Sequence, residues 1–382
     1  MFWNILKYRK DYFEHFVVFL LLASCGNPLF TNTEQAPRNY IFLTIFLIAF
    51  VCHKGGGRFA RKFLPYGLPM VLLFFLQSLV LDEYSFTSLL FIFAKLFIGA
   101  ACIIGFEQRF FKLYVNVMTF LAFVSLFGYF GNLFFGFIEG IAIEEENVSR
   151  LNSLVLYTQI YYYGELMLRN SGMFWEPGAF QGYICIAFVF LIKCTDLLHK
   201  KLYGGILTIA LITTFSTTGY IVFAFIVIYY TLYYNKVANG AKIVLFFLIV
   251  LLSAYAFYNL DFLGSKISID QSKNLYEEGR LNDFFRYSQL IFENLFFGIG
   301  PEVGKKMSTG NGLLSFLMYG GLFVNIFYYV RLIRNVAKQV EMRYAILLLS
   351  VVLLSLLGEG FLYYPLYLAL PLLVINRDTK LA

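Results

Sequence analysis

The sequence predicts an all-α membrane protein with about 12 transmembrane helices. Of its 382 residues, 60% are apolar and 14% are charged, whereas a soluble domain is about half apolar and a quarter charged. Apolar runs such as YIFLTIFLIAFVC and IVLFFLIVLLSAYAF recur along the whole chain. Because a bilayer-spanning helix needs about 20 mostly apolar residues, we expect a single integral membrane domain over residues 1–382.

The predicted spans follow one another with short connections, apart from two long loops. They fall near residues 13–29, 39–53, 65–81, 85–105, 113–137, 179–193, 204–217, 219–234, 243–260, 313–330, 344–357 and 363–376. The first span has a basic start, as a signal peptide would. However, Asp11 and Glu14 interrupt it and more spans follow, so we interpret it as a retained span.

The distribution of charge predicts that both termini lie in the cytoplasm. With that orientation, cytoplasmic segments hold 20 of the 30 basic residues but only 6 of the 23 acidic ones. This asymmetry is what the positive-inside rule predicts. The net charge of +7 is therefore explained by membrane topology and gives no reason to expect a nucleic-acid partner.

Residues 203–234 could form one long span or two short ones. Basic residues flank both ends, at Lys200 and Lys201 and again at Lys236 and Lys242, so the chain should return to the same face. The turn would lie at FSTTGY, whose polar side chains and glycine can bend and satisfy the backbone. We expect two spans.

Two long outer loops, residues 138–178 and 261–312, stand out because long loops are usually functional or disordered. Each has apolar residues at helical spacing and predicts an amphipathic helix at the membrane surface. The spaced positions are Leu151, Leu154, Val155, Thr158, Tyr161, Tyr162 and Leu166 in the first loop, and Leu281, Phe284, Phe285, Ile291, Phe292 and Leu295 in the second.

The first outer loop ends in RNSGMFWEPGAF, Arg169 to Phe180. Pro177 suits the first turn of a helix, which puts Glu176 at the N-terminus, where the helix dipole stabilises a carboxylate. Arg169 and Glu176 could form an interfacial salt bridge with a helix cap, or they could belong to a functional site.

The second outer loop adds Arg280, Arg286, Lys305 and Lys306. The planar fork of arginine suits bidentate recognition of phosphate oxygens. The basic residues could hold a lipid diphosphate, or they could reach ordinary phospholipid head groups.

These motifs, in this order, resemble the Wzy-type polysaccharide polymerases of the O-antigen polymerase and ligase superfamily. The resemblance covers roughly residues 115–360 and rests on RNSGMFWEP, STTG, EGR, FGIG and GNGLLSFLMYGGLF. It implies a GT-C-type glycosyltransferase of the bacterial inner membrane, which joins undecaprenyl-diphosphate-linked oligosaccharide repeat units on the outer face. It also implies that Arg169 and Arg280 hold the pyrophosphate, with Arg286 close by.

One departure separates the polymerase branch from the ligase branch. Ligases carry a histidine just before the asparagine that corresponds to Asn311, and this chain has Gly310 there. The histidines of this chain, His15, His53 and His199, fall at predicted cytoplasmic ends of spans. This favours a polymerase over a ligase, and Asn311 joins the expected substrate-binding residues.

The predicted chemistry needs charge stabilisation at a leaving diphosphate, which arginines can supply. Neither outer loop contains an Asp-x-Asp motif, and no metal or cofactor is expected. Deprotonating the attacking sugar hydroxyl calls for a base, for which Glu176 is the first choice and Glu278 and Asp283 are reserves. Glu176 could instead orient the acceptor by hydrogen bonding.

Three further residues lie within or near the predicted spans. Lys95 falls mid-span, where insertion costs about 2.5–3.5 kcal/mol, so it should pair with a carboxylate or face a water-filled cavity. Glu359 could line the site from below or be exposed at the surface. Tyr363 could stack on sugar or belong to the interfacial aromatic belt.

A transporter or flippase of lipid-linked sugars is the remaining alternative. Transporters place binding groups at the midplane on broken helices, often within internal repeats. No convincing repeat is found here, and the polar groups gather in the outer loops. The resemblance also implies a flippase and a chain-length regulator as partners, besides membrane lipids.

Overall fold

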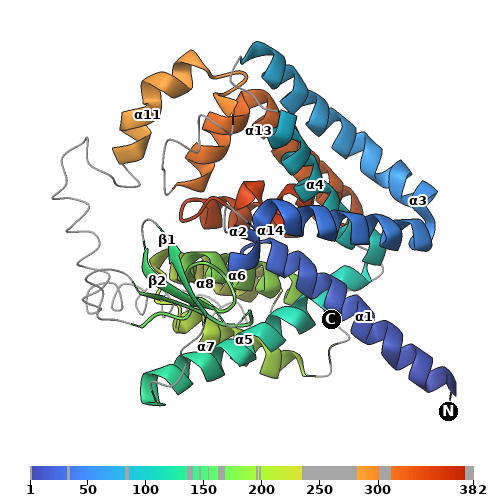
Figure 1. The fold of residues 1–382 in the computed structure, drawn as a ribbon, viewed down its shortest axis with the longest axis vertical. Coiled ribbons are helices and arrows are strands. Elements are labelled where there is room, and N and C mark those ends of the chain that lie inside the picture. The colour runs from blue at the N-terminus through green and yellow to red at the C-terminus, as the bar shows by residue number, and fades with distance from the viewer. Residues whose placement is uncertain are drawn as a thin grey trace.

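The computed structural model describes residues 2–31, 35–81, 86–135, 141–145, 148–153, 155–161, 168–194, 197, 199–234, 282–300 and 311–374. The predicted span 243–260 therefore lies outside the described residues. The described helices are α1 (Phe2–Ser24), α2 (Pro28–Thr31), α3 (Ala36–Val80), α4 (Phe86–Phe106), α5 (Arg109–Phe135), α6 (Pro177–Lys193), α7 (Lys200–Ile212), α8 (Thr217–Tyr233), α11 (Asn282–Glu293), α13 (Gly312–Gln339), α14 (Met342–Leu356) and α15 (Pro365–Ala369) (Figure 1).

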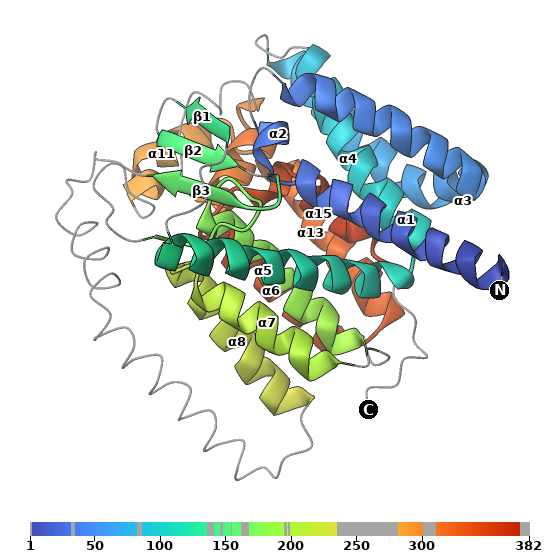
Figure 2. The same ribbon diagram turned by 60° about the horizontal axis from the view of Figure 1, so that its bottom comes forward.

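One group of helices packs around α6, whose side chains are buried along its whole length. It contacts α5, α7, α8 and α14. The two views place α3 and α4 together on one side of the molecule and α5, α7 and α8 on the other (Figures 1 and 2). α1 lies between these groups and touches both α4 and α5.

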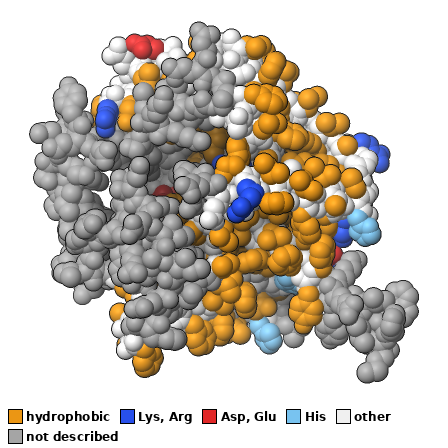
Figure 3. Space-filling view, in the orientation of Figure 1, with side chains coloured by type: hydrophobic (Ala, Val, Ile, Leu, Met, Phe, Trp, Pro, Cys, Tyr) orange, Lys and Arg blue, Asp and Glu red, His pale blue; other side chains and the backbone are white. Residues whose placement is uncertain are grey.

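Length and composition confirm a helical, membrane-embedded, multi-pass protein. Among the described helices, α4 and α5 are continuous, long and apolar enough to cross a membrane. α3 and α13 have the same length and composition only when they are counted across the breaks at Gly55 and Gly321, and α6, α8 and α14 are shorter apolar helices. Large apolar side chains are exposed along α3 and α5, among them Phe42, Leu72 and Phe127. The space-filling view shows a mostly hydrophobic surface on the side of α3 and α4 (Figure 3). Lipid would cover such a surface.

α3 is two antiparallel arms joined at Gly55, so the chain turns back between the predicted spans 39–53 and 65–81. Gly55 has φ 107° and ψ 76°, a conformation that favours glycine. The first arm runs alongside α4 in the same direction, with Tyr40 on Phe91 and Phe50 on Phe106. The second arm runs back, with Phe59 on Phe97.

The prediction of one continuous span over 313–330 is wrong, because α13 reverses at Gly321 (φ 64°, ψ −176°). The rings of Phe316 and Tyr328 lie 5.6 Å apart, although twelve residues of straight helix would separate them by about 18 Å. The segment around Gly298 fills the break: Ile299 N–H donates to Met318 O (2.7 Å) and Leu322 N–H donates to Leu295 O (2.8 Å).

The last predicted span, 363–376, is also corrected. Residues 361–372 form the 3-10 turns η1 (Phe361–Tyr363) and η2 (Leu370–Leu372) with the five-residue α15 between them. Pro365 and Pro371 explain this, since proline removes a helical hydrogen bond and clashes with the preceding turn. α15 packs on α4, where Gly99 lets the backbone of Pro365 approach.

The amphipathic helix predicted in the first outer loop is wrong as well. This loop contains an antiparallel sheet of strand order β1-β2-β3, with β1 at Ile141–Glu145, β2 at Val148–Ser153 and β3 at Thr158–Tyr161. Ser153 lies opposite both Ile141 and Thr158. Ile, Val, Thr and Tyr recur through these strands, and β-branched and aromatic residues favour pleated backbone over helix.

Two other predictions are confirmed. Residues 203–234 form two helices, α7 and α8. The turn covers residues 213–216 and so begins just before the predicted FSTTGY, while Thr217, Thr218 and Gly219 form the first turn of α8 with Ser216 as its N-cap. The amphipathic helix of the second outer loop is α11. It buries Tyr287 and Ile291 against the first arm of α13 and exposes Phe285 and Phe292.

Candidate functional site

The N-terminal end of α6 carries the first candidate site residue, Glu176. Glu176 is the N-cap, with extended backbone (φ −156°, ψ 162°), and Pro177 begins the helix. The indole N–H of Trp175 donates to Oε1 of Glu176 (2.8 Å). The backbone N–H of Trp175 donates to Gly26 O (2.9 Å), which ties this corner to the chain after α1. The carboxylate is therefore held in a fixed orientation and is half-buried.

Glu359 lies directly beside this helix end. Gly178, in the first turn of α6, contacts the carboxylate of Glu359, and a Cβ at position 178 would overlap it. Glycine at this position therefore leaves room for the Glu359 side chain to lie against the first turn of α6. Two carboxylates, Glu176 and Glu359, thus flank the first turn of α6.

Two further helix N-termini meet the same segment, residues 358–360. Gly312, the first residue of α13, packs against the backbone of Glu359. Gly358 packs against the side chain of Thr218, in the first turn of α8. Unpaired N–H groups and the helix dipole make a helix N-terminus electropositive, so three such ends around Glu359 favour negative charge there.

Side-chain caps fix two of these ends. The Asn311 Oδ1 accepts hydrogen bonds from Leu313 N–H and Leu314 N–H, both at 3.1 Å. The Ser216 Oγ accepts one from Gly219 N–H at 3.3 Å. Asn311 was predicted to bind substrate, and the structure gives its side-chain oxygen a capping role at the same place.

Aromatic rings and one lysine complete the surroundings. Trp175 stacks on Tyr364 with ring centroids 4.8 Å apart. Lys95 Nζ lies 5.6 Å from the centre of the Tyr364 ring and 5.4 Å from that of Tyr40, within the range of cation–π attraction. Lys95 is thus linked through Tyr364 and Trp175 to Glu176.

Tyr363 points into a different set of rings. Its ring lies 5.4 Å from Tyr319, 5.5 Å from Phe316 and 6.5 Å from Phe74. It therefore packs against the first arm of α13 and the second arm of α3. Tyr363 thus connects the segment 358–364 to the first arm of α13, just before the reversal at Gly321.

Arg169 lies at the turn between α7 and α8. Its Nε–H donates to Thr214 O (3.1 Å) and its Nη2 donates to Phe215 O (3.2 Å). Arginine has five N–H donors, and these bonds use two of them. Asn170 adds bonds from its Nδ2 to Thr213 Oγ1 (2.9 Å) and Ser125 Oγ (3.1 Å). The loop that carries Arg169 is thereby fixed beside the N-terminus of α8.

The second-loop residues are placed only in part. Arg286 is exposed on α11, with its guanidinium carbon 5.3 Å from the Tyr287 ring centre. Arg280, Glu278, Lys305, Lys306 and Gly310 lie outside the described residues, and so does the side chain of Asp283.

The structure thus brings together Glu176, Glu359 and the capped N-terminus at Asn311, with Tyr363 on the adjoining segment. Arg169 lies beside the N-terminus of α8, which meets the same segment 358–360. Among the described residues, no contact links Arg286 to this group. The sequence interpretation did not assign Trp175, Thr218 or Lys95 to the site. Only Lys95 gave a signal, because a mid-span lysine is costly.

Comparisons of the chain with protein-family models, with curated proteins and with solved structures returned no match. Within the described part of the chain, no group of three or more His, Cys, Asp or Glu side chains is placed to hold a metal ion.

Proposed function

We propose that the protein is a polysaccharide polymerase, a GT-C-type glycosyltransferase that joins undecaprenyl-diphosphate-linked oligosaccharide repeat units. It would act on the outer face of the bacterial inner membrane, with both termini in the cytoplasm, in O-antigen, capsule or exopolysaccharide synthesis. The observation that carries this proposal is the convergence of the α6, α8 and α13 N-termini on residues 358–360, beside the carboxylate of Glu176.

The electropositive helix ends suit the donor's diphosphate. When the bond from the anomeric carbon to the diphosphate oxygen breaks, negative charge grows on the leaving undecaprenyl diphosphate. Fixed dipoles and cations stabilise such charge without reorganising. Arg169 would supply part of this stabilisation from the α7–α8 turn, and Arg280 would supply another part from the second outer loop.

Glu176 suits the acceptor side of the same reaction. An acceptor sugar hydroxyl attacks the donor's anomeric carbon, and its proton passes to a base within hydrogen-bond reach. The hydrogen bond from Trp175 holds the Glu176 carboxylate in one orientation. Glu176 acts as this base or, in the alternative, orients the hydroxyl.

The surrounding residues would bind glycan and lipid. The Trp175–Tyr364 stack offers an aromatic face for a sugar ring, and Glu359 a hydrogen-bond acceptor beside it. Arg286 and Tyr363 remain in the proposed substrate-binding set. A flippase that supplies repeat units and a chain-length regulator are the partners that the resemblance to Wzy-type polymerases implies.

One observation favours a second function, transport of lipid-linked sugars. Transporters bind substrates at broken helices, and α13 is broken at Gly321. The reversal there is closed by backbone hydrogen bonds to residues 295–299, which makes it a packed structural element. An O-antigen ligase, which passes glycan to a different acceptor, is the other alternative.

Reconstitution of the purified protein with an undecaprenyl-diphosphate-linked repeat unit tests the proposal. The expected result is a ladder of repeat-unit multiples, by gel or mass analysis, without a nucleotide sugar. Movement of a labelled lipid between leaflets without a ladder would reassign the protein to transport. Product formed only with a lipid A core acceptor would reassign it to ligation.

A further inference from the structure

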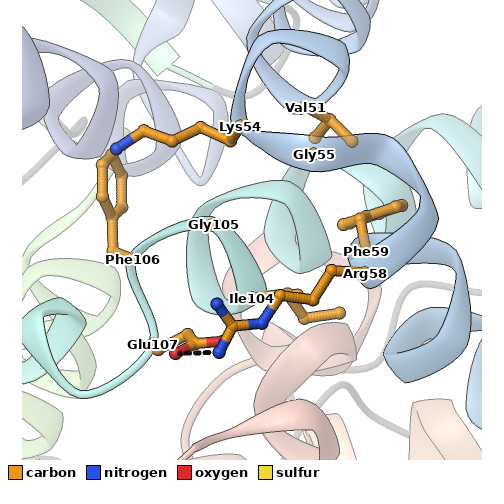
Figure 4. Close-up of a pocket in the computed structure, with 9 residues that line it drawn as sticks. All are labelled: Val51, Lys54, Gly55, Arg58, Phe59, Ile104, Gly105, Phe106 and Glu107. Atoms are coloured by element: carbon orange, nitrogen blue, oxygen red, sulfur yellow. Dashed lines mark hydrogen bonds and ion pairs between the residues drawn. The ribbon is translucent and has the colours of Figure 1, made fainter.

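A cavity of about 230 Å³ lies at the other end of the helices, between the reversal of α3 and the last turn of α4. Lys54 and Arg58 line it from α3, and Glu107 lies at the end of α4 (Figure 4). Val51, Phe59 and Ile104 give it an apolar wall. The cavity therefore joins charged groups to an apolar surface.

The acidic groups at this end are already paired. Glu107 is held by Lys62 (2.6 Å) and Arg58 (3.0 Å). Glu14, whose side chain is 1% exposed, is held by Arg109 (2.6 Å) and Lys54 (3.4 Å). Each carboxylate therefore has two cations, and neither needs a further positive partner.

Cations exceed acids in this region, so positive charge remains for an external anion. The described segments 11–14, 53–62 and 107–112 hold three acids, Asp11, Glu14 and Glu107, and six cations, Lys54, Arg58, Arg61, Lys62, Arg109 and Lys112. The Arg58 side chain is 66% exposed, and the donors on its fork can be shared between Glu107 and another acceptor.

The backbone leaves room for that anion. A Cβ at Gly55 would meet no atom within 4 Å, and the same holds at Gly56 and Gly57. Of these three glycines, Gly55 lines the cavity, beside Lys54 and Arg58.

The cavity also lies at the edge of the apolar surface. Phe13 and Phe16 on α1 and Ile48 on α3 are exposed, and they lie within a few residues of the charged groups Glu14 and Lys54. Charged residues that follow an apolar, exposed helix surface mark the depth of lipid head groups.

We infer that this cavity binds the phosphate of an anionic phospholipid head group, with Lys54 and Arg58 as the phosphate contacts. The apolar wall would contact the glycerol and the first acyl carbons. Basic pockets between transmembrane helices suit such head groups. This site is separate from the one proposed for glycan polymerisation and does not depend on it.

Native mass spectrometry of the purified protein with added phosphatidylglycerol or phosphatidylcholine tests the inference. The expected result is tighter binding of phosphatidylglycerol, weakened about fivefold by Arg58→Gln, as the loss of one cation near a lipid phosphate predicts. Arg61→Gln is the matched control, since Arg61 is exposed in the same turn but does not line the cavity. It should change the affinity less than twofold.

Equal losses in Arg58→Gln and Arg61→Gln, or no loss in Arg58→Gln, would overturn the site. Arg58→Lys covers the case in which Arg58→Gln fails to fold, because it keeps the charge beside Glu107. Because Arg58→Lys loses only the bidentate fork of the guanidinium, it should weaken phosphatidylglycerol binding two- to threefold. Displacement of the lipid by an equal concentration of glycerol 3-phosphate would instead assign the cavity to a soluble phosphate ester.

Discussion

The two reversals of the chain, at Gly55 in α3 and at Gly321 in α13, use the same backbone device in opposite surroundings. Both glycines have positive φ. Around Gly55 a Cβ would find open space, whereas at Gly321 it would overlap the backbone of Phe296 and Gly298. Charged side chains surround the first reversal, and packed backbone surrounds the second.

The difference shows how a membrane protein can turn a helix back in two ways. At Gly55 the turn lies among cations and carboxylates, where water and head groups can satisfy the backbone. At Gly321 the chain supplies its own partners, because Gln77 Nε2 donates to Phe297 O and Tyr319 O and residues 295–299 pair with the break. The second reversal holds the N-terminus of α13 against Glu359.

Gly321→Ala should give the largest effect on stability. It combines a strained backbone with overlap against other backbone atoms, so the free energy of unfolding should fall by about 3 kcal/mol or more. Thermal unfolding in detergent measures this. Gly56→Ala, in the open reversal, is the control and should change stability by less than about 0.5 kcal/mol. Similar losses in both variants would mean that the two reversals do not differ in packing.

Gln77→Leu should come next. Gln77 is buried, and its loss leaves the carbonyls of Phe297 and Tyr319 without this donor, at a cost of about 1–3 kcal/mol. Hydrogen exchange should increase at the amides of Ile299 and Leu322, which close the break. Ser78→Ala, on the exposed side of the same helix, should leave both exchange rates unchanged.

Gly55→Ala should cost about 1–2 kcal/mol, because it strains the backbone without creating an overlap. The expected order of melting temperatures is therefore wild type, Gly55→Ala, Gly321→Ala, from highest to lowest. If Gly55→Ala melts below Gly321→Ala, the α3 reversal is packed more tightly than the α13 reversal, which would contradict the comparison.

Asn311→Ala should cost about 1 kcal/mol through loss of the α13 cap. Asn311→Ser separates capping from substrate binding, because serine caps nearly as well. If Asn311→Ser keeps both stability and polymer yield, the role of Asn311 is capping. Full stability with lost polymer would support direct substrate contact.

The sequence predicted those parts of the fold that local pattern determines. Apolar length located α4, α5, α6 and α14, and the polar turn at Ser216 separated α7 from α8. The reversal at Gly55 was predictable because three glycines lie among basic residues. Gly321 lies within an apolar run, and its break depends on Gln77 and Gly298, which are far away in the sequence.

Individual residues of the site could be predicted from the sequence, but their arrangement in space could not. Glu176 and Pro177 gave the start of α6 through known helix preferences. The meeting of Gly178, Gly312 and Thr218 around residues 358–360 is tertiary, and no local pattern encodes it. The aromatic residues of the first outer loop fitted a helical period, yet their β-branched neighbours favoured strands.

The proposed glycan transfer would occur at the α6 end of the molecule and not at the charged α3–α4 end. The most direct measurement is the initial rate of ladder formation by reconstituted Glu176→Gln and Glu107→Gln, two isosteric changes at opposite ends. If Glu176 is the general base, Glu176→Gln should form the ladder at least 100-fold more slowly. If Glu176 only orients the acceptor hydroxyl, the loss of rate should be smaller. Glu107→Gln should stay within about twofold of wild type. A Glu176→Gln rate equal to wild type, or an equal loss in Glu107→Gln, would contradict the account.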